Sequence, residues 1–175
     1  MREALIVVDM LRDFIDPDGA LRVPGGQAIV PAVLRELERA RQEGHLVAFV
    51  CDSHAPDDLE FSRFPPHAVT GTAGAEIIPG LKPRSGEIVV PKRRLDPFFD
   101  TELADLLKRE KVTQATVVGV CTHICVMETV GSLSSMDIPA RVPRDAVADF
   151  DPEMETAALK RMASVFGTDI TSDGV

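Results

Sequence analysis

Short runs of hydrophobic residues alternate with amphipathic segments along this chain. The runs are mostly β-branched and continuous, which is typical of strands buried on both faces of a parallel sheet. They predict strands over residues 4–8, 46–50, 87–90, 116–120 and 138–142, with a last edge strand over 168–171.

Apolar residues recur at helical spacing between these runs. Ile29, Val33 and Leu37 lie on one face of a first helix, which Gly44 ends. Further helices are predicted over 73–78, 101–110, 125–136 and 151–162. Strands that alternate with helices imply right-handed βαβ crossovers. We therefore expect an α/β fold, a Rossmann-like three-layer α/β/α sandwich with a six-stranded parallel sheet, as a single domain over 1–175.

Composition limits the class of partner. The net charge of −9 argues against nucleic acid or an anionic membrane as the main partner. No apolar run approaches the ~20 residues that span a bilayer, and the N-terminus is charged too early for a signal peptide. The three cysteines form no CxxC pair, which indicates free thiols in a reducing compartment. We expect a cytoplasmic homo-oligomer that binds a small molecule.

Cys125 falls in the first turn of the helix that follows the 116–120 strand. Free backbone N–H groups and the positive end of the helix dipole favour the thiolate there, and the thiolate is the nucleophile. Most free cysteines are simply small apolar core residues. The case for a nucleophile therefore depends on what else lies at this edge of the sheet.

Asp9 and Lys92 follow strands at the same edge, where parallel sheets bind ligands. Considered one at a time, Asp9 is best interpreted as a loop carboxylate and Lys92 as a solvated cation. With Cys125 they complete a set for acyl transfer. Cys125 would attack a carbonyl carbon, Asp9 would carry the thiol proton to the leaving amine, and Lys92 would favour the ionised forms of both. The backbone N–H groups of Cys121 and Cys125 would stabilise the oxyanion.

A second cluster of polar residues begins where the second strand ends. Asp52 and His54 are two apart and face the same side of extended backbone, while Glu60 and His67 lie in the proline-rich loop over 55–72. A loop this long is usually functional. Two imidazoles and two carboxylates suit Zn²⁺, with Mn²⁺ or Fe²⁺ as alternatives, better than Ca²⁺ or Mg²⁺. The alternative is a merely polar loop with solvated histidines, because D-x-H alone is a weak signal.

Two aromatic residues, Phe14 and Phe64, lie in loops at this edge. Such residues are most often core, but here either ring could stack on a planar ligand. Residues expected to be structural thiols or solvated cations are Cys51, Cys121, Arg93 and Arg94.

Six blocks of the sequence resemble those of the isochorismatase-like cysteine hydrolases, and within them most resemble the nicotinamidases (pyrazinamidases). The blocks are ALIVVDMLRDF (4–14), DSH (52–54), EFSRFPPH (60–67), GTAGAE (71–76), KRRLDPFFDTEL (92–103) and GVCTHICV (119–126). Because they cover nearly the whole chain in the family's order, the resemblance is specific.

The resemblance implies an isochorismatase-like fold and an amidase site. The implied residues are a catalytic triad of Asp9, Lys92 and Cys125, a cis peptide between Val120 and Cys121, and metal ligands at Asp52, His54, Glu60 and His67. It also implies that Phe14 and Phe64 sandwich a pyridine ring whose nitrogen binds the metal. Leu11 departs from the family's frequent Gln, and Leu95 stands where several nicotinamidases carry Tyr near the substrate.

The expected function is a metal-containing amidase that hydrolyses nicotinamide to nicotinate and ammonia through a thioester on Cys125. A related amidase that acts on another small amide is the nearest alternative, since Leu95 removes a possible ring contact. A non-catalytic metal or thiol sensor on the same fold is an alternative of a different class.

Overall fold

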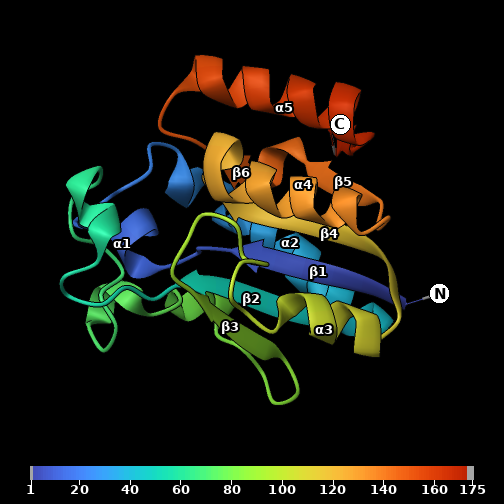
Figure 1. The fold of residues 1–175 in the computed structure, drawn as a ribbon, viewed down its shortest axis with the longest axis horizontal. Helices are drawn as coiled ribbons and strands as arrows, with labels where there is room; N and C mark the ends of the chain where they lie inside the picture. The colour runs from blue at the N-terminus through green and yellow to red at the C-terminus, as the bar shows by residue number, and fades with distance from the viewer. Residues whose placement is uncertain (1, 173–175) are drawn as a thin grey trace.

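The strands of this protein form one parallel sheet with the long strands β1 and β4 side by side at its centre. The computed structural model describes residues 2–172 (Figure 1). The strands are β1 (Arg2–Val8), β2 (Leu46–Asp52), β3 (Ile88–Lys92), β4 (Val112–Val120), β5 (Ala140–Pro143), β6 (Val147–Ala148) and β7 (Asp169–Thr171). Their order is β3-β2-β1-β4-β5-β7, and β6 pairs with β4 outside this path.

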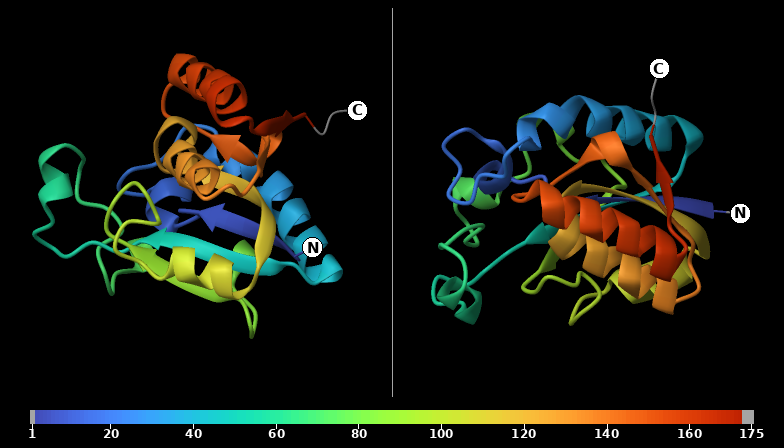
Figure 2. Two further views of the ribbon diagram at one scale, coloured as in Figure 1. Left: turned by 45° about the vertical axis from the view of Figure 1, so that its right-hand side comes forward. Right: turned by 90° about the horizontal axis from the view of Figure 1, so that it is seen from above.

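Helices cover both faces of the sheet (Figure 2). On one face lies α2 (Gly26–Glu43), and on the other lie α3 (Leu103–Arg109), α4 (Met127–Ser135) and α5 (Pro152–Phe166). Short helical segments occupy the connections: α1 (Arg12–Ile15), η1 (Leu59–Ser62), η2 (Ala73–Ala75), η3 (Pro79–Leu81), η4 (Thr122–Val126) and η5 (Arg144–Ala146). This arrangement confirms the predicted α/β/α sandwich.

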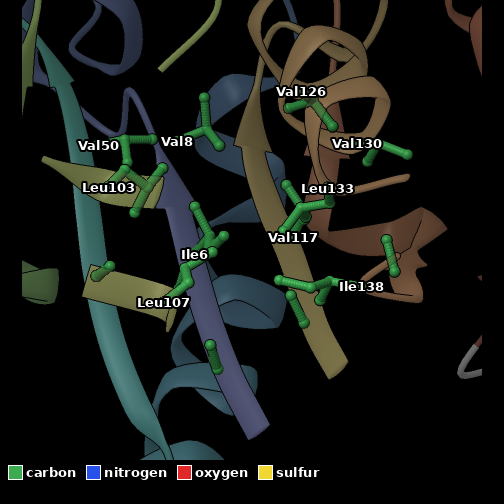
Figure 3. Packing of buried hydrophobic residues seen from close by; sticks show 14 of the residues in the cluster. Ile6, Val8, Val50, Leu103, Leu107, Val117, Val126, Val130, Leu133 and Ile138 are labelled. Atoms are coloured by element: carbon green, nitrogen blue, oxygen red, sulfur yellow. The ribbon is translucent and has the colours of Figure 1, made fainter. Parts of the chain in front are cut away.

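Alternation along β1 builds a core on each face. Ile6 and Val8 pack toward α3 and α4, whereas Leu5 and Val7 pack toward α2. Figure 3 shows the first of these clusters, in which residues of the central strands meet Leu103, Leu107, Val130 and Leu133. A strand buried on both faces needs apolar residues at every position, which is why its sequence is a continuous run.

Three elements differ from the sequence-based expectation. The helix predicted over 73–78 is only the three-residue segment η2. The sheet has a seventh strand, β6, whose two residues pair with Gly119 and Val120 of β4. A two-residue strand carries too little pattern to be recognised, and only its pairing with β4 defines it. The segment around Phe14, expected to be a loop, contains α1, which buries Phe14 and Ile15.

The carboxyl ends of four adjacent strands meet at one edge of the sheet. Asp9 directly follows β1, Asp52 ends β2, Lys92 ends β3, and Cys121 directly follows β4. Within residues 2–172, no helix combines the length and the hydropathy needed to cross a bilayer.

Gly119 permits the closest backbone approach in the centre of the sheet. It has a φ of +116°, pairs with Val8, and a Cβ added there would lie 2.0 Å from the carbonyl oxygen of Val8. We expect Gly119→Ala to lower the free energy of unfolding by at least about 3 kcal/mol, or to prevent folding, because backbone atoms on both strands must shift. Thermal and urea denaturation would measure this.

The matched control is Gly80→Ala, at a position where no described residue lies within 4 Å of the added Cβ. We expect that variant to change stability by less than about 0.5 kcal/mol. A Gly119→Ala protein as stable as the control would contradict the argument.

Candidate functional site

The buried ammonium group of Lys92 joins three of the strand ends. Lys92 is fully buried, and its Nζ lies 2.8 Å from Oδ2 of Asp9 and 3.5 Å from Sγ of Cys125. It also forms an ion pair with Oδ1 of Asp52. The other carboxylate oxygen of Asp9, Oδ1, accepts the backbone N–H of Asp52 at 2.7 Å. The fold therefore brings the three predicted catalytic side chains into one buried cluster.

The charges in this cluster set one another's protonation. Burial alone lowers the pKa of Lys92, but the carboxylates of Asp52 and Asp9 outweigh it and hold that pKa well above its usual value. Burial, reinforced by the charge of Asp52, raises the pKa of Asp9 to about 6 although Lys92 acts in the opposite direction. A carboxylate with this pKa is mostly ionised at pH 7 yet holds a proton more firmly than an exposed aspartate does.

Cys125 differs from the sequence-based expectation in its protonation. Burial raises the pKa of its thiol well above the usual value, and Lys92 offsets this only in part. Lys92 therefore favours the thiolate, as expected, but burial has the larger effect and favours the thiol in the free protein. Burial depends on how the surrounding segments pack, which the local sequence does not reveal. A base must take the proton when the thiol reacts. Lys92 contacts both Asp9 and Asp52, and of these two carboxylates Asp9 is the one whose pKa is raised toward neutrality.

Three of the four predicted metal ligands converge. One donor atom each from Asp52, His54 and His67 can be chosen so that all lie within 4.8 Å of one another, and all three residues are buried. Nε2 of each histidine is 3.6 Å from Oδ2 of Asp52. Glu60 lies outside this set, but its carboxylate is buried, it lines the adjacent pocket, and Oε2 has no hydrogen-bond partner among the described residues.

The donor chemistry of these residues fits a divalent transition metal. Nδ1 of His67 contacts the carbonyl oxygen of Pro65 at 2.7 Å, so it carries the proton and leaves the lone pair on Nε2. Both ring nitrogens of His54 are buried with no hydrogen-bond partner within residues 2–172. A buried imidazole nitrogen without a partner is costly unless its lone pair serves as a ligand. Two imidazoles and a carboxylate suit Zn²⁺, Mn²⁺ or Fe²⁺.

A small pocket opens between the catalytic cluster and His67. Its aromatic and aliphatic walls include both predicted aromatic residues, Phe14 and Phe64, whose rings lie edge-on to His67 at centroid distances of 5.3 and 6.2 Å. The remaining lining residues are Asp9, Leu21, Asp52, Glu60, His67, Leu95, Val120, Cys121, Ile124, Cys125 and Phe150. The bond between Val120 and Cys121 is the expected cis peptide.

A buried carboxylate that the sequence pattern did not predict, that of Asp149, contacts the segment that carries Cys125. Asp149, which follows β6, accepts the backbone N–H of His123, the ring Nδ1–H of His123 and the backbone N–H of Phe150, each at 2.6 Å. Because Phe150 lines the pocket, Asp149 joins the pocket wall to the turn that carries Cys125. The signal in the sequence is faint, since Asp149 lies in an acidic stretch with Asp145 and Asp151.

Arg93 and Arg94 were expected to be solvated cations, and both side chains are partly open to solvent, but each also has a buried partner. Both guanidinium groups reach the buried carboxylate of Asp58, Arg93 at 3.3 Å and Arg94 at 3.2 Å. The acceptor lies 35 residues earlier in the chain, so nothing in the local sequence indicates the contact. Cys51 and Cys121 are buried free thiols, and Cys121 also lines the pocket.

Comparison with known proteins gives a consistent set of relatives. Residues 3–174 match the family model described as Isochorismatase domain. A nicotinamidase/pyrazinamidase from Mycobacterium tuberculosis is 31% identical over 175 residues, which cover 91% of this chain and 93% of that protein. A protein from Arabidopsis thaliana named as a probable inactive nicotinamidase is 35% identical over 173 residues, which cover 93% and 88%.

The solved structures agree. The crystal structure of the pyrazinamidase of Pyrococcus horikoshii in complex with zinc superposes with a TM-score of 0.93 at 32% identity. The match covers 98% of this chain and 99% of that one.

Asp149 provides a test of how the Cys125 segment is held. Asp149→Ala leaves N–H groups of His123 and Phe150 without their acceptor, and we expect the free energy of unfolding to fall by about 2–4 kcal/mol. Urea denaturation measures the change, with Asp18→Ala in an exposed loop as the control. Equal stability of the two variants would show that Asp149 does not hold this segment.

Proposed function

Since the chain belongs to the isochorismatase family, we propose that its site hydrolyses a small uncharged amide through Cys125, with nicotinamide as the first candidate. Its relatives include proteins named as nicotinamidase, ureidoacrylate amidohydrolase and N-carbamoylsarcosine amidase. The protein is accordingly a hydrolase that acts on amide C–N bonds. The single observation that carries the assignment of residues is the buried Lys92 ammonium in contact with both Asp9 and Cys125.

The chemistry follows from the arrangement of these three side chains. Asp9 accepts the thiol proton while Sγ of Cys125 attacks the carbonyl carbon. Lys92 stays charged beside Sγ as negative charge develops there. Asp9 then passes that proton to the departing nitrogen, so ammonia leaves and a thioester remains. Asp9 next takes a proton from water, whose oxygen attacks the thioester carbon. The C–S bond breaks to release the carboxylic acid, and Asp9 returns its proton to Sγ of Cys125. The backbone N–H groups of Cys121 and Cys125 are the proposed donors to the oxyanion.

The metal ligands in this proposal are Asp52, His54 and His67, with Glu60 as a further candidate. A divalent metal, when bound, supplies a Lewis acid to which a ring nitrogen can attach. Phe14 and Phe64 would then hold the ring between them.

The pocket walls favour a substrate without a carboxylate. The lining residues include neither lysine nor arginine, and three carboxylates, those of Asp9, Asp52 and Glu60, are among them. An anionic group on the substrate would lose its hydration in this mostly apolar pocket and would find no lysine or arginine among the lining residues to pair with. Nicotinamide is uncharged and planar, which fits these walls.

A different small uncharged amide is the second candidate. Leu95 lies in the pocket wall, so the departure from the Tyr of several nicotinamidases is at a substrate-facing position. The similarity to a protein named as a probable inactive nicotinamidase points the same way.

The first test is ammonia release from nicotinamide by purified, metal-loaded, reduced protein. We expect turnover, and we expect Cys125→Ala to lower kcat by a factor on the order of 10³ or more because the thioester cannot form. Residual activity near wild type would remove Cys125 from this role. Turnover of other neutral amides but not of nicotinamide would favour the second candidate. Bound metal with no turnover of any amide would favour a sensor.

The metal site has its own test. We expect His67→Ala to lose bound metal and to raise KM at least about tenfold, because it removes one of the three converging donors. Elemental analysis of the purified protein and steady-state kinetics measure the two effects. His45→Ala is the matched control, since His45 lies 3.2 Å from Glu43 outside the group of converging donors. Unchanged metal content in His67→Ala would show that the ligands are assigned wrongly.

A further inference from the structure

One buried carboxylate close to the proposed metal site has no part in the function described so far. The Asp58 side chain has no exposed surface, although it lies in the loop over 55–72. Its Oδ1 accepts the backbone N–H of Glu60 at 3.0 Å and so caps η1. A buried carboxylate in a loop needs further partners to offset its lost hydration.

The first of these partners is His54. Oδ2 of Asp58 lies 3.3 Å from Nδ1 of His54, whose ring is fully buried. The other ring nitrogen, Nε2, points to the opposite side, where Oδ2 of Asp52 is 3.6 Å away. A carboxylate beside Nδ1 favours the tautomer that carries its proton there, which leaves the lone pair of Nε2 for a metal.

The second set of partners comes from the segment after Lys92. Arg94 lies 3.2 Å from Oδ1 of Asp58, and Arg93 lies 3.3 Å from Oδ2. Both guanidinium groups are partly open to solvent, whereas the carboxylate that they hold is not. Their chain neighbour Lys92 pairs with Asp52. The end of β3 is therefore tied twice to the loop of proposed metal ligands, once at Asp52 and once at Asp58.

From this geometry we propose that Asp58 is a positioning residue, held by Arg93 and Arg94, that orients His54 for metal binding. The inference rests on the metal site of the proposed function. On this proposal, Arg93 and Arg94 influence metal affinity through their contact with Asp58, although neither is itself a proposed metal ligand. The competing interpretation is that Asp58 serves only as the cap of η1.

Asp58→Asn separates these two roles. Asparagine is as good a helix cap as aspartate, so its side-chain oxygen can still accept from Glu60. It lacks the negative charge that lies 3.3 Å from Nδ1 of His54 and favours a proton there, and its amide nitrogen is a donor rather than an acceptor. The matched control is Asp57→Asn, which makes the same change of charge at the exposed neighbouring residue.

The experiment is a competition titration of Zn²⁺ against a chromophoric chelator, with the full-length protein prepared free of metal. We expect Asp58→Asn to bind Zn²⁺ about 10- to 100-fold more weakly than wild type. We expect Asp57→Asn to stay within about twofold, and the metal-free proteins to melt at similar temperatures. We expect Arg93→Gln with Arg94→Gln to weaken binding in the same direction, because Asp58 then loses the groups that hold it.

The outcomes separate this inference from the proposed function. Wild type that binds Zn²⁺, with Asp58→Asn binding it equally well, would overturn the inference alone. Wild type that binds neither Zn²⁺, Mn²⁺ nor Fe²⁺ would overturn the proposed metal site and the inference with it. If the metal-free Asp58→Asn protein melts far below wild type and Zn²⁺ affinity is unchanged in its folded fraction, Asp58 is a cap only.

Discussion

The ion pairs of the buried Lys92 ammonium are the interaction on which the rest of the site depends. An ammonium group without exposed surface is tolerated only beside anions, and Asp9 and Asp52 supply two carboxylates for one positive charge. The excess of one negative charge has two consequences. It keeps Lys92 protonated and adds to the effect of burial in raising the pKa of Asp9 toward neutrality. It also leaves Oδ2 of Asp52 as an anionic donor facing both histidines. Catalytic cluster and candidate metal site thus share Asp52.

The order of the strands in the sheet explains why the catalytic cluster and the candidate metal site can share Asp52. The strands β3, β2, β1 and β4 are consecutive neighbours, so the groups at their carboxyl ends lie side by side in the same order. The close approach at Gly119 keeps β4 in register with β1, and the turn to Cys125 begins directly beyond it. A parallel sheet thereby collects side chains from Asp9 to Cys125 at one edge, which is the general reason that such folds bind ligands there.

The catalytic cluster and the candidate metal site are each held by a different buried aspartate that lies outside the pocket. Asp149 accepts N–H groups beside the turn that carries Cys125, and Asp58 contacts the far nitrogen of His54. Each carboxylate also accepts backbone N–H groups of the segment beside it, from His123 and Phe150 in one case and from Glu60 in the other, which fixes that segment without entering the pocket. The short strand β6 contributes to this arrangement because it places Asp149 beside the end of β4.

The sequence by itself determined the fold class, the main strands and helices and the candidates Asp9, Lys92 and Cys125, because burial on both faces imposes continuous apolar runs whose ends mark the binding edge. The spacing of Asp52 and His54 likewise indicated a possible metal site. Only the tertiary structure decided that burial keeps Cys125 a thiol, that β6 exists, that Glu60 lies apart from the converging ligands, and that Arg93 and Arg94 hold Asp58. These features arise from contacts between segments distant in the chain. The local hydrophobic pattern indicates how each segment is buried, but not which distant segment it contacts.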